Sequence, residues 1–200
     1  MTTQPKTPSM QDVFERNKYD LKTAVKKSRG WYTQQVMLLS KQGITPQRLM
    51  REDTGNQKAR IIPGNLYMFV YDPKLKATLP YYDRFPLVFP YAAVPGGFMG
   101  LNMHYLPYAL RIRLLDRLLV FKNNDKMDAT TRLKYSWNLI ANVSKFELAK
   151  PCIKHYLTPH VKTAFKKIDS NDWATAMLLP VEKFIKAPKE KVWKDSQASI

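Results

Sequence analysis

Short alternating stretches of apolar residues in the middle of the chain predict β-strands. They occupy residues 66–71, 85–89 and 98–105, and turns that contain proline or glycine separate them. Strands of this length joined by such turns are typical of antiparallel sheets. We therefore predict a small antiparallel sheet or a partly closed barrel over about residues 60–105.

The same alternation assigns side chains to the two faces of this sheet. In the first strand Tyr67, Phe69 and Tyr71 share one face. In the third strand the polar residues Asn102 and His104 share a face with each other. A histidine in such a position is more often a hydrogen-bonded support than a general base, so we predict the structural role for His104.

Helical periodicity appears on both sides of the predicted sheet. In residues 107–121 apolar side chains recur at steps of three and four, and the arginines of this segment are expected to point away from that stripe. Residues 152–157 fit either a strand or a turn. The segments that we predict to be helical are 10–42, 46–51, 107–121, 128–146, 158–167 and 172–179.

These elements predict an α+β fold in three parts. Residues 1–60 form a basic helical arm, residues 61–180 an α+β core domain and residues 181–200 a Lys-rich tail. The chain has 200 residues, enough for one domain with appended arms. Hydrophobic residues make up 44%, which excludes a wholly disordered protein.

Charge changes the picture, because the chain carries a formal net charge of +17. Residues 1–60 and 122–200 each carry +7, whereas residues 61–121 carry only +3. An uncompensated excess of this size indicates a polyanionic partner, although a solvated basic surface is the simpler alternative. The candidate DNA-binding residues are Lys18, Lys22, Lys26, Lys27, Arg29, Arg111, Arg113, Arg117, Lys162, Lys166 and Lys167.

Other classes of protein find little support. No apolar stretch approaches the roughly 18 residues of a membrane span, and no apolar segment near the first residue suggests a secretory signal. The single cysteine excludes an internal disulfide. Cys152, His155 and His160 resemble metal spacing only superficially, because no fourth ligand is evident. We therefore predict neither a metal nor another cofactor.

Catalytic patterns are equally sparse. The chain has no phosphate-binding loop, no dinucleotide-binding glycine motif and no nucleophile elbow. A metal-dependent nuclease needs clustered carboxylates, whereas the candidates Glu52, Asp53, Asp72 and Asp83 are spread among turns. We predict that the protein is not an enzyme and keep a nuclease as the weaker alternative.

An unusual aromatic and charged corner precedes the second strand. Tyr81, Tyr82, Asp83 and Arg84 follow one another there. One interpretation is an exposed patch for stacking or phosphate contact. The interpretation that we prefer is a structural corner, supported by His104, in which polar side chains satisfy loop backbone groups.

Three segments of the middle region carry a resemblance: Gly64–Lys74, Leu79–Val88 and Gly97–Pro107, continuing from Arg111. They resemble the DNA end protector family of T-even-like tailed bacteriophages. The resemblance implies a non-enzymatic virion protein that binds double-stranded DNA termini through the phosphate backbone and protects packaged ends. It also implies location in the virion, and in the host cytoplasm during assembly. The alternative is a minor structural subunit of the head, neck or baseplate whose arms bind acidic virion proteins.

Overall fold

The computed structural model describes most of the chain after residue 56. The described residues are 57–108, 110, 111, 114, 115, 118, 127–145, 147–178 and 182–198. Residues 1–56 of the predicted basic arm lie outside them, whereas its last four residues, 57–60, are described and include a short strand. Several residues of the predicted sites also lie outside the described residues: Lys18, Lys22, Lys26, Lys27, Arg29, Glu52, Asp53, Arg113 and Arg117.

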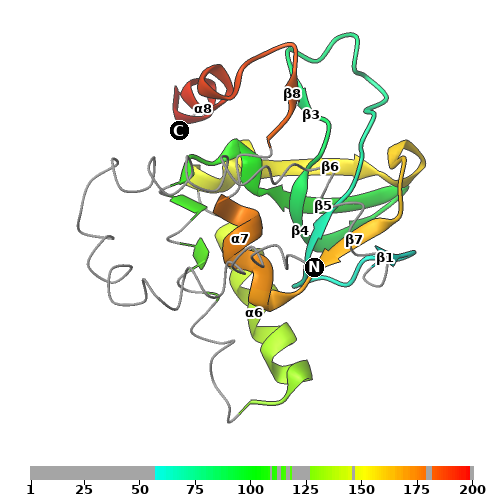
Figure 1. Cartoon of the computed structure of the whole chain (residues 1–200), viewed down its shortest axis with the longest axis vertical. Helices are drawn as coiled ribbons and strands as arrows, with labels where there is room; N and C mark the ends of the chain where they lie inside the picture. Colours follow the sequence, from blue (N-terminus) through cyan, green and yellow to red (C-terminus); the bar gives the residue numbers. More distant parts are fainter. Residues whose placement is uncertain are drawn as a thin grey trace, which may run out of the picture.

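An antiparallel sheet of six strands forms the centre of the fold, in the order β1-β7-β2-β4-β5-β6 (Figure 1). A separate two-stranded sheet pairs β3 with β8. The α+β prediction is confirmed, but the sheet extends past residue 105 because β6 and β7 join it from the later part of the chain. The strands are β1 (Gln57–Lys58), β2 (Leu66–Met68), β3 (Tyr82–Asp83), β4 (Leu87–Val94), β5 (Gly97–Asn102), β6 (Ile153–Leu157), β7 (Phe165–Ile168) and β8 (Phe184–Ile185).

Helices follow and interrupt the strands. Asp128 begins α6 as its N-cap, because its carboxylate accepts a hydrogen bond from the Thr131 amide at 2.8 Å. The described residues from 108 to 118 are helical as well. None of the described helices is long and apolar enough to cross a membrane. The α-helices are α6 (Ala129–Val143), α7 (Trp173–Leu178) and α8 (Lys189–Ala198), and the 3₁₀ turns are η2 (Met103–Tyr105), η3 (Glu147–Cys152), η4 (Thr158–His160) and η5 (Ser170–Asp172).

A tight turn at residues 94–97 joins β4 to β5, as the sequence predicts. Val94 pairs with Gly97 across the turn, and Gly96 between them has a φ of +74°. Proline followed by a glycine of positive φ is the combination that a type II turn needs. Gly97 also lies so close to β6 that an added Cβ would come within 1.9 Å of the Tyr156 carbonyl oxygen.

The two faces of the six-stranded sheet bury different side chains. One face, the helix face, packs Leu66 and Met68 against Met177 of α7 and Val192 of α8. The opposite face buries a cluster of packed aromatic rings. We call it the groove face, because an apolar groove opens at its edge. That cluster contains Tyr67, Phe69, Tyr71, Val88, Phe98, Tyr156 and Phe165, so the predicted shared face of the first three is confirmed.

The sheet curls around this aromatic cluster. The rings of Tyr71, which follows β2, and Tyr156 of β6 lie 5.0 Å apart, although β4 and β5 separate these strands in the sheet. A single bridge between Tyr71 and Val161 reinforces the approach. The sheet is therefore strongly curved, but it does not close into a barrel.

One predicted helix is wrong, and the third predicted strand ends earlier than expected, because residues 103–105 form the 3₁₀ turn η2. The helix expected over 158–167 is limited to the 3₁₀ turn η4, because residues 165–168 pair with β2 as strand β7. This long-range pairing overrides the local helical pattern. The Lys-rich tail expected over 181–200 contains β8 and α8, and the Val192 side chain of α8 is completely buried. Residues 153–157, predicted as a strand or a turn, form β6.

Candidate functional site

Strand β7 separates two lysines that the sequence groups together. Lys166 pairs with Met68 and is only 4% exposed, whereas Lys167 pairs with Tyr67 and is half-buried. Directly paired residues of antiparallel strands point to the same side of the sheet. Lys166 therefore belongs to the helix face and Lys167 to the groove face. In the helix predicted over 158–167 both lysines would lie near Lys162, whereas the alternation of faces in the strand puts Lys166 and Lys167 on opposite sides of the sheet.

Basic side chains gather on the groove face of the sheet. Lys58 of β1 is paired with Phe165, a member of the aromatic cluster, and its side chain is exposed. Arg60, two residues after Lys58, is exposed as well. Lys162 is exposed but points away from this face, because its extended neighbour Val161 packs against the aromatic cluster and successive side chains alternate in direction. The Asp169 carboxylate lies 3.9 Å from Lys167. We call Lys58, Arg60 and Lys167 the groove-face cations.

An apolar groove opens beside these cations at one end of the curled sheet. Its volume is about 230 Å³, and the buried rings of Phe98 and Phe165 contribute to its lining. Ala93 of β4, which pairs with Phe98, lies at its exposed edge together with Arg60. Among the described residues that line it, none is acidic. The groove therefore combines an apolar floor with a cationic edge.

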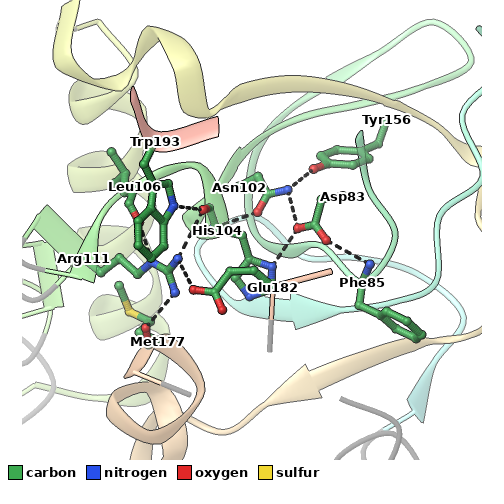
Figure 2. Close-up of polar contacts among 10 residues, drawn as sticks. All are labelled: Asp83, Phe85, Asn102, His104, Leu106, Arg111, Tyr156, Met177, Glu182 and Trp193. Carbon is green, nitrogen blue, oxygen red and sulfur yellow. Dashed lines mark hydrogen bonds and ion pairs between the residues drawn. The ribbon is translucent and has the colours of Figure 1, made fainter. Parts of the chain in front are cut away.

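Arg111 does not belong to this surface. The sequence predicts that Arg111 contacts phosphate, but its side chain is fully buried and lies 2.7 Å from Glu182 Oε1 (Figure 2). Its other nitrogens donate to the carbonyl oxygens of Leu106, His104 and Met177 at 2.8, 3.2 and 3.2 Å. Arg111 precedes the buried Leu114 and Leu115 by three and four residues, so all three share one helical face. The guanidinium group therefore joins internal segments through hydrogen bonds and an ion pair. Arg111 is no longer a candidate DNA-binding residue.

Asp83 lies at the centre of a second buried polar cluster. Its carboxylate lies 2.7 Å from His104 Nδ1 and accepts hydrogen bonds from Asn102 Nδ2 at 3.1 Å and from the Phe85 amide at 3.0 Å. The Asn102 amide also donates to the Tyr156 hydroxyl at 3.0 Å. This network ties β3 and the loop that follows it to β5 and β6 (Figure 2).

The remaining members of the predicted corner play smaller parts. Tyr81 is half-buried and packs edge-on against Phe184 of β8. Tyr82 of β3 is half-buried as well. The Arg84 residue is exposed, but its backbone is fixed by two hydrogen bonds. Its amide donates to the Lys183 carbonyl at 3.0 Å, and its carbonyl accepts from the Tyr71 amide at 3.0 Å. The Arg84 side chain is therefore available as a surface charge.

The ion pair between Arg111 and Glu182 makes the fold sensitive to acid. Burial raises the pKa of the Glu182 carboxyl, but the Arg111 and His104 charges outweigh burial, and the pKa lies below its ordinary value. A carboxyl with a lowered pKa stabilises the folded state above its ordinary pKa, and this contribution is lost as the pH falls through the folded value.

We expect the Glu182→Gln variant to lose stability at neutral pH, and the difference from the wild type to shrink below about pH 4. Urea unfolding followed by tryptophan fluorescence between pH 7 and pH 3 measures both quantities. A difference between the two proteins that grows on acidification would contradict this assignment.

The candidate metal ligands do not converge into a site. Cys152 is buried, and burial raises the pKa of its thiol to about 12, so it stays protonated at neutral pH. His160 Nδ1 lies 2.9 Å from the Asp72 carbonyl oxygen, and His155 is exposed. Within the described ranges no three histidine, cysteine or acidic residues are grouped to hold a metal ion.

The described carboxylates that a nuclease could use are engaged separately. Asp72 pairs with Lys76 at 2.9 Å on the surface, and Asp83 is buried in the network with His104. A cation site needs carboxylates that face a common point. The structure therefore brings no support to the nuclease alternative from these two residues.

Sequence analysis missed Lys58 and Arg60 because they lie between the helix predicted over 46–51 and the strand predicted over 66–71, where the sequence pattern predicts neither a helix nor a strand. Their spacing of two, next to a strand pair, is the signal that could have placed both on one face of a sheet. Glu182 was missed as well, because a lone carboxylate far from Arg111 in sequence carries no local signal.

Comparison with protein families gives one match that covers most of the chain. A family model described as Phage T4 terminal DNA protecting protein matches residues 15–196. No curated protein and no solved structure gives a significant match. The family match spans the described fold and part of the basic segment that precedes it.

Proposed function

The chain belongs to the family of phage T4 terminal DNA protecting proteins, and from this premise we propose that it binds double-stranded DNA ends through their phosphate backbone. The bound protein would shield the ends of packaged DNA. The observation that carries the proposal is the groove face, where Arg60 lines an apolar groove, Lys58 and Lys167 point to the same face, and the described lining residues include no acidic side chain.

Phosphate binding needs accessible cations and no catalytic centre. Lysine and arginine side chains at a surface neutralise phosphates and release counterions, which gives affinity without sequence preference. The net charge of +17 supplies this attraction over the whole chain. The candidate basic residues between Lys18 and Arg29, which lie outside the described residues, would add further positive charge.

The protein would protect a DNA end by occupying it, and it would not need to catalyse a reaction. An exonuclease must reach the terminal phosphodiester bond, and a protein seated on the end blocks that approach. We therefore propose a non-enzymatic role that requires neither a metal nor another cofactor. The protein would act in the virion, after assembly in the host cytoplasm, and acidic virion proteins would be its second class of partner.

We expect the full-length protein to protect linear duplex DNA from a processive exonuclease. Protection should fall steeply with salt: if the three groove-face cations each neutralise one phosphate, affinity drops roughly 40-fold between 50 and 200 mM salt. The measurement is the half-life of an end-labelled linear duplex at rising protein and salt concentrations.

Two controls separate this role from its alternatives. A nicked circular duplex of the same sequence tests end preference, and incubation with Mg²⁺ or Mn²⁺ without exonuclease tests for cleavage by the protein itself. Linear DNA degraded equally fast with and without the protein at low salt would contradict the proposal. The protein would then be better explained as an assembly subunit.

A further inference from the structure

We propose that the apolar groove of the groove face binds the terminal nucleotide of a DNA strand, with its base on the apolar floor and its phosphate beside Arg60. This inference rests on the proposed function and adds the means by which the protein distinguishes an end from internal duplex. Backbone contacts alone do not make that distinction, because phosphates are repeated along the whole duplex.

An apolar surface beside cations can bind the exposed face of a terminal base, which only a DNA end presents. Inside a duplex each base is covered by its neighbours on both sides, so no base face is accessible. At an end the last base exposes one face and frays readily. Stacking on an apolar or aromatic surface is insensitive to sequence, because every base has such a face. A protein that must hold ends of any sequence therefore benefits from stacking more than from base-edge hydrogen bonds.

The lining of the groove fits this ligand. Apart from Arg60 and Thr158, the lining residues in the described part of the chain are all apolar or glycine. Its floor is firm, because Phe98 and Phe165 belong to the aromatic cluster and their ring centroids lie 5.9 Å apart. A firm floor favours stacking, since little conformational entropy is lost when the base binds.

The size of the groove favours a single base. Its volume of about 230 Å³ is below the roughly 300–1,000 Å³ of pockets that enclose drug-sized ligands. A full base pair would extend beyond it. The second base would lie outside, so a frayed or overhanging terminal nucleotide is the ligand that we favour.

The cations at the edge of the groove match the charge of a nucleotide. Arg60 lines the groove itself, and a guanidinium group can hold a phosphate through two parallel hydrogen bonds. Lys58 points to the same face, since it is paired with Phe165 of the floor. A neutral apolar peptide would gain nothing from these charges, which is why a nucleotide is the occupant that the groove favours.

The test fills the groove and leaves the cations in place. Ala93→Trp puts a bulky side chain at the groove edge, and Ala77→Trp is its control, because Ala77 is also exposed and does not line the groove. We expect Ala93→Trp to lower affinity for a linear duplex about tenfold or more, while affinity for the circular duplex stays within twofold. Ala77→Trp should behave as the wild type on both substrates.

A second pair of variants tests the cationic edge. Arg60→Gln should weaken binding to linear DNA more than binding to circular DNA. Arg84→Gln removes the same charge from an exposed position outside the groove and should weaken both equally. Thermal unfolding of all four variants confirms that each is folded. A duplex with 2-aminopurine at its last position should change its fluorescence on binding, and one with the probe in the interior should not.

The outcomes separate this inference from the function on which it rests. If the wild type shows no preference for ends, the proposed function fails. If the wild type prefers ends and Ala93→Trp keeps the full preference, the groove assignment is wrong and the function stands. If Ala93→Trp keeps end binding but loses incorporation into particles, the groove binds a neighbouring protein, and the nucleotide assignment is overturned.

Discussion

Replacing Arg111 by alanine is expected to lower the free energy of unfolding by ~3–5 kcal/mol, because it leaves the buried Glu182 carboxylate without its partner. The substitution also removes a donor from each of the Leu106, His104 and Met177 carbonyl oxygens. An effect of this size is a large part of the ~5–15 kcal/mol that stabilises a typical domain. We therefore expect much of the variant to be unfolded at 37 °C.

Urea unfolding monitored by tryptophan fluorescence measures this effect, since Trp193 packs within 5.7 Å of the guanidinium group. Arg111→Lys should retain only part of the stability, because one ammonium group cannot replace the fork of donors. The double variant Arg111→Met/Glu182→Leu should recover stability relative to Arg111→Ala, since it leaves no uncompensated charge. A double variant as unstable as Arg111→Ala would show that the ion pair is not the cause.

Arg111 also marks a limit of reasoning from sequence. The stripe of leucines in residues 107–121 correctly predicts a helix with a buried face. It gives no reason to bury the arginine that shares this face, since charged residues are rarely buried without a partner. The partner, Glu182, is 71 residues away. Such a pairing is fixed by the tertiary fold and leaves no mark in local periodicity.

The local sequence pattern predicts the structure correctly where the contacts join residues that are close in sequence. The shared face of Tyr67, Phe69 and Tyr71, the turn at residues 94–97 and the N-cap at Asp128 of α6 all follow from spacing and residue type. It failed at residues 158–167, where β7 exists because β1 and β2 offer edges to pair with. The misassigned helix also misplaced Lys166, since faces alternate in a strand.

The groove shows why a candidate site is harder to predict than a fold. Its lining comes from residues 59–63, 90–98, 158 and 165, which meet only when the sheet curls. Charge density pointed to a polyanion. The position of the apolar floor next to Arg60 could not be read from composition, because it depends on the register of the β1–β7 and β4–β5 pairs and on the curl of the sheet between them.

The second large effect is expected at Asp83. Asp83→Ala removes the acceptor for His104 Nδ1, Asn102 Nδ2 and the Phe85 amide, all of which are buried. An unsatisfied buried donor costs about 1–3 kcal/mol, so losing this acceptor should destabilise the protein by ~3 kcal/mol or more. Asp83→Asn should be milder, because its amide oxygen can still accept from the Phe85 amide.

DNA affinity distinguishes a buried support from a contact site at this corner. Under conditions where Asp83→Asn stays folded, its affinity for linear duplex should equal that of the wild type, because the side chain does not reach the surface. Arg84→Ala gives the converse result: unfolding is nearly unchanged, since the side chain is exposed, while binding weakens slightly through the lost charge. An Asp83→Asn variant of full stability with impaired binding would place the corner in the DNA interface and would overturn its structural role.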